Sequence, residues 1–175
     1  QTNADCLAGD GINDTITIPA GTITLTADLP QITVPVVIDG AGMGQTIIDG
    51  DGLHVTLSAS ANTLDPIFNV TFQDMKIIGY NSRAIYTDNV NVIIKNIEIE
   101  GQAGVGGEGI ETMADRADPT SIEIENVYIH NMDVTGFFRV LVVNEASIGE
   151  INAILKNITI ADIHSTGQGS LFGVM

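Results

Sequence analysis

The chain has 175 residues, with 22 acidic residues against 6 lysines and arginines, and a net charge of −16 at pH 7. This charge argues against nucleic acid or an anionic membrane surface as a partner, because both repel an acidic protein. No apolar run approaches the ~20 residues that a membrane helix needs, and the abundance of glycine, with no tryptophan, is typical of a β-protein with many turns. Such acidity suits a protein outside the cell. The charge would also attract divalent cations such as calcium loosely. A charged surface that keeps a β-protein soluble explains it more simply, and we expect no cofactor.

Residues 1–65 predict the first, irregular coils of a β-structure. Residues 1–13 are polar and contain Cys6, the single cysteine, which either has its partner outside this chain or is inert. The Ser/Ala/Asn/Asp/Pro content of residues 58–66 predicts a surface loop. Apolar runs that end at turn signals predict strands, and they occur at residues 15–18, 22–26, 36–42 and 46–52.

Residues 66–175 repeat one pattern four times: apolar, polar, Asn or Asp, apolar, polar, Ile. The residues before each copy alternate at period two, as in a strand with one buried face. The steps between the turn residues are 22, 30 and 31 residues, a spacing that indicates a solenoid of stacked units. The turn residues are Asp74, Asn96, Asn126 and Asn157.

The recurrent Asn or Asp has a physical reason. A coil that bends sharply between two strands needs a residue that tolerates positive φ, and Asn and Asp do so most easily among the non-glycine residues. In coils stacked at roughly 4.8 Å, these side chains can bond to one another as a ladder in the turn. Four unrelated turns in a β-sandwich are the alternative, but such turns would not repeat the flanking residue types.

A third apolar run follows each copy at a nearly constant distance, as stacking demands. The runs lie at residues 84–87, 109–112, 140–143 and 170–173. The predicted fold is therefore all-β: a right-handed, single-stranded parallel β-helix with about three short strands per coil. We expect one domain over residues 1–175, with irregular coils over 1–65 and four regular coils over 66–175.

Residues 13–52 contain the runs T-I-T-I-P-A-G-T-I-T-L-T and T-I-I-D-G-D-G. This stretch resembles the opening coils of the choice-of-anchor or CSLREA-type bacterial extracellular β-helix repeat proteins, which are related in style to polymorphic outer-membrane proteins. The resemblance implies a secreted or surface-attached protein, usually without assigned chemistry. In that family a Cys-containing CSLREA segment commonly stands just before the position of Gln1. Its absence here implies that the chain begins inside a larger domain and that the partner of Cys6 lies upstream.

An enzyme of the pectate-lyase-like β-helix type, a polysaccharide lyase or glycoside hydrolase, is the alternative, and it rests on analogy of fold. Such lyases need clustered Asp ligands for calcium and a basic residue, whereas hydrolases need two carboxylates about 5 to 10 Å apart. Aligned third strands bring together one candidate group, although an ion-pair ladder explains it more simply. The group is Arg83, Glu108 and Arg139, with Glu111 and Asp88 nearby.

Metal ligands are not expected. The three histidines, His54, His130 and His164, are far apart in the chain, and no pair has the spacing of zinc ligands. Residues 49–52 read Asp-Gly-Asp-Gly, but they are not followed by the spaced carboxylates of an EF-hand, so a turn is the better interpretation.

The sequence as a whole favours a non-catalytic, secreted or cell-surface module that acts as an adhesin, spacer or assembly unit. Residues 170–175 form the third strand of the last coil, and nothing follows to cover its core, so we expect an uncapped end. The expected partners are other copies of the chain, end to end in a filament, or further coils of the same chain. A surface glycan or a host protein is a further candidate.

Overall fold

The computed structural model describes residues 13–101, 107–134, 138–145, 150–166 and 169–174. Cys6 lies outside these residues. Among the described residues, no helix is long and apolar enough to cross a membrane. The strands are β1 (Asp14–Thr17), β2 (Gly21–Thr24), β3 (Val36–Asp39), β4 (Thr46–His54), β5 (Leu57–Ser60), β6 (Asn69–Tyr80), β7 (Ser82–Asp88), β8 (Asn91–Glu100), β9 (Gly107–Ala114), β10 (Thr120–Val134), β11 (Phe138–Glu145), β12 (Ile151–Ser165) and β13 (Gly169–Val174).

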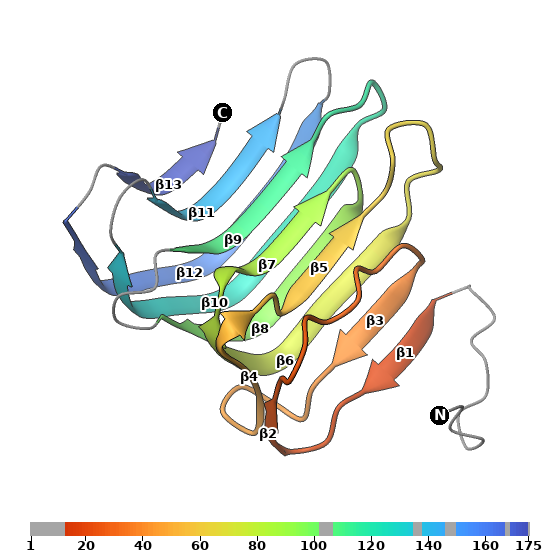
Figure 1. Cartoon of the computed structure of the whole chain (residues 1–175). Coiled ribbons are helices and arrows are strands. Elements are labelled where there is room, and N and C mark those ends of the chain that lie inside the picture. Colours follow the sequence, from red (N-terminus) through yellow and green to blue (C-terminus); the bar gives the residue numbers. More distant parts are fainter. Residues whose placement is uncertain (1–12, 102–106, 135–137, 146–149, 167–168, 175) are drawn as a thin grey trace, which may run out of the picture.

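The strands form two parallel sheets that stack coil upon coil (Figure 1). The larger sheet has the order β1-β3-β6-β8-β10-β12, and β2 joins it through β4, which pairs with β6. The smaller sheet has the order β13-β11-β9-β7-β5. The chain visits the two sheets in turn and makes about four turns. The prediction of an all-β parallel β-helix is therefore confirmed.

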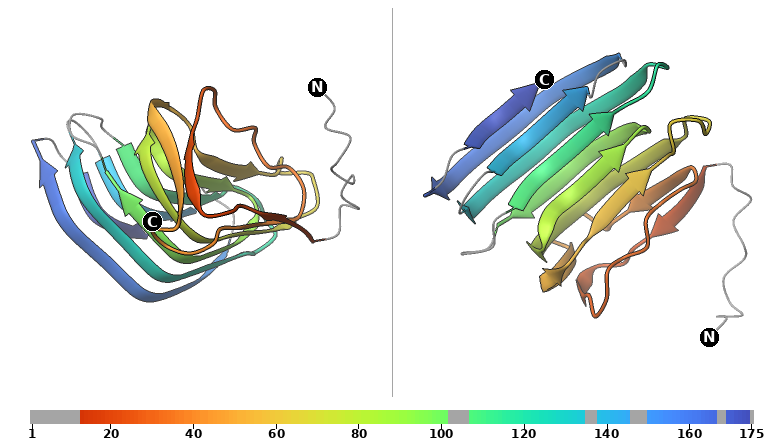
Figure 2. Two further views of the ribbon diagram at one scale, coloured as in Figure 1. Left: turned by 90° about the horizontal axis from the view of Figure 1, so that it is seen from below. Right: turned by 45° about the horizontal axis from the view of Figure 1, so that its top comes forward.

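The long strands of the larger sheet bend, as the blue and cyan strands in the left view of Figure 2 show. The turn residues lie within these strands. All four turn residues have positive φ: 59° at Asp74, 51° at Asn96, 55° at Asn126 and 52° at Asn157. Pairing continues on both sides of the bend. Each regular coil thus has three faces, two from the limbs of one bent strand and one from the smaller sheet.

The turn side chains form the ladder that the sequence predicts. Asn96 Nδ2 donates to Asp74 Oδ1 at 2.9 Å, Asn126 Nδ2 to Asn96 Oδ1 at 3.0 Å, and Asn157 Nδ2 to Asn126 Oδ1 at 2.9 Å. Asp74 and Asn96 are partly buried, whereas Asn126 and Asn157 are exposed. The ladder therefore acts through backbone conformation and side-chain bonds rather than through burial.

We expect Asn126→Leu to destabilise the fold by about 1 to 3 kcal/mol, because leucine is strained at positive φ and breaks two ladder hydrogen bonds. Asn126→Gly is the matched control, since glycine adopts this conformation freely and loses only the side-chain bonds. Thermal and urea unfolding measure both variants. Equal losses for leucine and glycine would show that backbone strain does not contribute.

A second corner lies five residues after the first, and the sequence pattern did not reveal it. Gly79, Asn131 and Asp162 adopt φ of 58°, 54° and 53° there. Gly101 stands at the same position, and a Cβ on it would lie 2.6 Å from the Cα of Met132 in the next coil. The column is hard to recognise because its residue types change from coil to coil.

The expected loop at residues 58–66 is partly wrong, because Leu57–Ser60 is strand β5 of the smaller sheet. Leu57 and Ala59 are buried, and the two serines between and after them are partly buried. The run is only four residues long and alanine is a small, weakly hydrophobic residue, so its alternation with serine is a weak strand signal. The third-strand runs of the regular coils do lie in the smaller sheet, within β7, β9, β11 and β13.

Candidate functional site

A polar cluster lies on the outer face of the second limb of the larger sheet. Lys76 of β6 stands beside Glu98 of β8, and Glu98 stands beside Tyr128 of β10. One step further along the limb, Glu100 is paired with His130. These side chains face outward because the residues that alternate with them are fully buried in the core: Ile77, Ile99 and Ile129.

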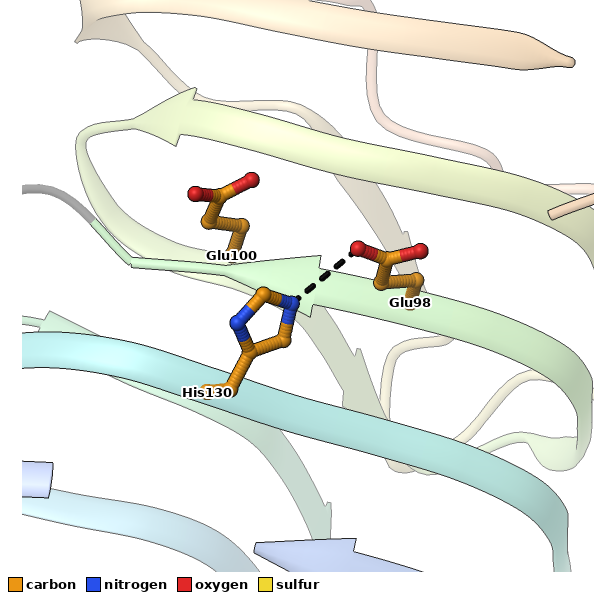
Figure 3. A group of neighbouring side chains, drawn as sticks. All are labelled: Glu98, Glu100 and His130. Carbon is orange, nitrogen blue, oxygen red and sulfur yellow. Dashed lines mark hydrogen bonds and ion pairs between the residues drawn. The ribbon is translucent and has the colours of Figure 1, made fainter. Parts of the chain in front are cut away.

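Figure 3 shows three members of the cluster, Glu98, Glu100 and His130, with the contact between His130 and Glu98 as a dashed line. Lys76 Nζ lies 2.8 Å from Glu98 Oε1 and 2.6 Å from Glu100 Oε2. His130 Nε2 lies 3.0 Å from Glu98 Oε1, and the His130 ring stacks on Tyr128 with centroids 4.2 Å apart. His130 is only 8% exposed. One ligand atom from each of Glu98, Glu100 and His130 lies within 4.8 Å of the other two.

Lys76 controls the charge of this cluster. Burial alone would raise the pKa of Glu98, but hydrogen bonds from Lys76 and His130 outweigh it, and the pKa is lowered. The pKa of Glu100 is lowered chiefly by its hydrogen bond with Lys76. Burial opposes the charge on Lys76, yet the two carboxylates raise its pKa. Both carboxylates are therefore ionised at neutral pH and held by one ammonium group.

Ligand spacing along the chain does not reveal this group, because its members come from different coils. Glu98 and His130 are 32 residues apart but lie on adjacent strands. A signal was present, since Glu100 and His130 each stand four residues after a turn asparagine, Asn96 or Asn126. Alignment of the two coils on their turn asparagines therefore places Glu100 beside His130, as the structure shows. His164 and His54 lie elsewhere, 3.2 Å from Asp133 and Asp28, respectively.

The structure also brings together most of the predicted group on the smaller sheet. Arg83 and Glu108 are paired in register, and Arg83 Nε lies 2.8 Å from Glu108 Oε2. The same nitrogen contacts Glu111 Oε2. The Arg83 side chain is 38% exposed and that of Glu111 is 2% exposed. The Arg83 guanidinium lies over the ring of Tyr86, 4.9 Å from its centroid.

The two remaining members of that group are Asp88 and Arg139. Asp88 lies at the opposite end of β7, where burial and the neighbouring Asp115 raise its pKa. The side chain of Arg139 is outside the described part of the structure. Its backbone lies in β11, two residues before Leu141, and Leu141 is paired with Ile110 of β9. This register is consistent with the predicted stacking of Arg139 beside Glu108.

The chemistry of the Arg83 group favours an ion pair over a catalytic base. Burial opposes the charge on Arg83, but Glu108 and Glu111 raise its pKa, so the guanidinium stays protonated and cannot abstract a proton. Beside it is an open surface hollow of about 220 Å³. The hollow is lined by Gln31, Val55, Ser58, Asn81, Ser82, Arg83 and Tyr86.

Every lysine or arginine whose side chain is described pairs with a carboxylate. Besides Lys76 and Arg83, Lys95 lies 3.7 Å from Glu123 and 3.9 Å from Glu125. Lys156 lies 3.8 Å from Glu123, and Arg116 lies 3.2 Å from Asp118. Apart from the Arg116 pair, these contacts join neighbouring coils. Four of the bases whose side chains are described thus link neighbouring coils: Lys76, Arg83, Lys95 and Lys156.

No protein-family model, no curated protein and no solved structure matches this chain.

Proposed function

We propose that this chain is a non-catalytic β-helix module that acts as an adhesin, spacer or assembly unit. The observation that supports the proposal is that ion pairs link neighbouring coils. Carboxylates of a neighbouring coil pair with each of four basic residues: Lys76, Arg83, Lys95 and Lys156. Cross-coil pairs of this kind reduce repulsion among stacked acidic strands. They serve the stiffness of the solenoid rather than a reaction.

We place the module outside the cell, secreted or on a cell surface. Its net charge of −16 keeps an elongated β-protein soluble. The likeness of residues 13–52 to choice-of-anchor and CSLREA-type β-helices agrees with this location. A surface glycan or a host protein is the partner that an adhesin would bind.

Assembly is proposed through the β12 edge of the larger sheet. In the described part of the chain, β12 pairs with β10 alone. Its core residues Leu155, Ile158 and Ile160 are only partly buried, whereas their neighbours Ile124, Val127 and Ile129 are at most 1% exposed. A further coil, from the same chain or another copy, would cover these side chains and pair the open edge.

We therefore expect the 175-residue chain to associate at tens of micromolar in sedimentation velocity. Ile158→Lys places a charge on the face that a further coil would cover, and it should shift the distribution toward monomer. Thr159→Lys, at the neighbouring exposed position, is the matched control and should leave association unchanged. A monodisperse wild-type monomer would contradict this part of the proposal.

The second candidate is a glycan-cleaving enzyme, favoured by the convergence of Arg83, Glu108 and Glu111 beside a surface hollow. We expect no release of unsaturated or reducing sugar from a panel of acidic and neutral glycans. Glu108→Gln separates the two functions, because a structural glutamate tolerates this change with a small loss of stability, under about 1 kcal/mol. Sugar release that Glu108→Gln abolishes, with the fold intact by circular dichroism, would establish the enzyme.

A further inference from the structure

The Glu98, Glu100 and His130 side chains provide two carboxylates and one imidazole on one face. This donor set suits zinc and other divalent transition metals, and calcium or magnesium would use the oxygens alone. His130 is 8% exposed, so the nitrogen donor is part of the packed structure rather than of a loose acidic surface. We propose that these three side chains bind a divalent transition-metal ion, represented by Zn²⁺, in competition with the ammonium group of Lys76.

The site is built on rigid elements. Glu98 and Glu100 extend from β8 and His130 from the adjacent strand β10, as Figure 3 shows. Stacking on Tyr128 holds the imidazole ring, and Asn131 Nδ2 donates to Glu100 Oε1 at 3.3 Å. These surrounding contacts are of the kind that orient ligands around a metal.

Lys76 shows that the two carboxylates already hold a cation. Its Nζ lies 2.8 Å from Glu98 and 2.6 Å from Glu100. One ammonium leaves a net charge of −1 on this pair, whereas a divalent ion would neutralise it. The metal must displace Lys76, whose side chain is 18% exposed and can turn toward solvent. The wild-type site is therefore weak, and removal of the lysine strengthens it.

The geometry needs only side-chain adjustment. Zinc takes its ligands at about 2.0 to 2.2 Å, which brings ligand atoms to about 3.4 Å from one another. The three ligand atoms lie within 4.8 Å, and rotation of the two glutamates closes the difference. His130 Nε2 lies 3.0 Å from Glu98 Oε1 and donates its proton to this carboxylate. Metal binding therefore replaces this hydrogen bond: the ring carries its proton on Nδ1, and the Nε2 lone pair and the Glu98 oxygen both turn to the metal.

The test is calorimetric titration of the folded chain with Zn²⁺. We expect Lys76→Met to bind Zn²⁺ with at least about tenfold higher affinity than wild type. Lys76→Met/His130→Gln should bind Zn²⁺ with about tenfold lower affinity than Lys76→Met. Lys76→Met/His164→Gln is the matched control and should bind like Lys76→Met, because His164 pairs with Asp133 in another part of the surface. Equal affinity in all four proteins would overturn the proposal.

Two further measurements test the site, the first in the wild-type chain and the second in Lys76→Met. Nitrogen NMR of the imidazoles in the wild-type chain should show Nε2 of His130 shifting at lower Zn²⁺ concentration than His54 or His164. An unmoved His130 would overturn the proposal. Ca²⁺ should bind Lys76→Met more weakly than Zn²⁺ does. If Ca²⁺ bound as tightly as Zn²⁺ and His130→Gln left its affinity unchanged, the binding would be a general attraction of cations to acidic groups. This outcome would also overturn the proposal.

Discussion

Phe72→Ala should lower the free energy of unfolding by about 3 to 5 kcal/mol. Phe72 is 0% exposed and stands in the first limb of β6, paired with Ile38 on one side and Ile94 on the other. Its removal leaves a cavity between three coils. Because each coil packs only on its neighbours, no distant part of the chain can move in to fill it.

Urea unfolding, followed by circular dichroism, measures this loss. Ile154→Ala is the matched control, since Ile154 lies on the same limb of a later coil but is 50% exposed. It should change stability by no more than about 0.5 kcal/mol. A loss below about 1 kcal/mol for Phe72→Ala would mean that the coils do not pack around this ring.

Arg83→Met should destabilise the chain by about 2 to 3 kcal/mol. Removal of one partner of a buried ion pair costs about 3 to 5 kcal/mol. The expected loss of stability is smaller here because the Arg83 side chain is 38% exposed, so solvent screens the ion pair. The cost falls on Glu111, whose side chain is 2% exposed and loses this ion pair. Glu108→Gln should cost less, because glutamine retains a carbonyl that accepts from Arg83.

A double mutant separates charge from packing. If the Glu111 carboxylate causes the loss, Arg83→Met/Glu111→Gln should regain part of the stability that Arg83→Met loses, as measured by urea unfolding. No recovery would show that Arg83 acts through its packing on Tyr86 instead, where the guanidinium lies 4.9 Å from the ring centroid.

The fold was predictable because its signals are local. Period-two alternation and the tolerance of Asn and Asp for positive φ are properties of a few consecutive residues. The turn column of Asp74, Asn96, Asn126 and Asn157 could therefore be found in the sequence. Strand β5 was missed because it has only four residues and alternates the small, weakly hydrophobic Ala59 with serines. The second corner was missed because glycine, asparagine and aspartate all satisfy it.

The contacts within the polar clusters depend on the register between coils. The sequence indicates this register only weakly. Arg83 and Glu108 were aligned correctly because a constant distance from the turn residue places them in one column. The contact between Glu98 and His130 was not predicted, because the two residues stand at different distances from the turn asparagines of their coils. They meet only because their side chains are long enough to reach each other.

The sequence by itself thus determined the coil, its turns and its buried face, all of which follow from backbone preference and hydrophobic alternation. Apart from the pair of Arg83 and Glu108, the tertiary structure decided which charges meet. Loops of unequal length set steps of 22, 30 and 31 residues between turns, so contacts across coils have no constant spacing in the chain. Lys76 shares two carboxylates of the next coil, and His130 joins them from the coil after that, because parallel strands in register bring equivalent positions to within side-chain reach.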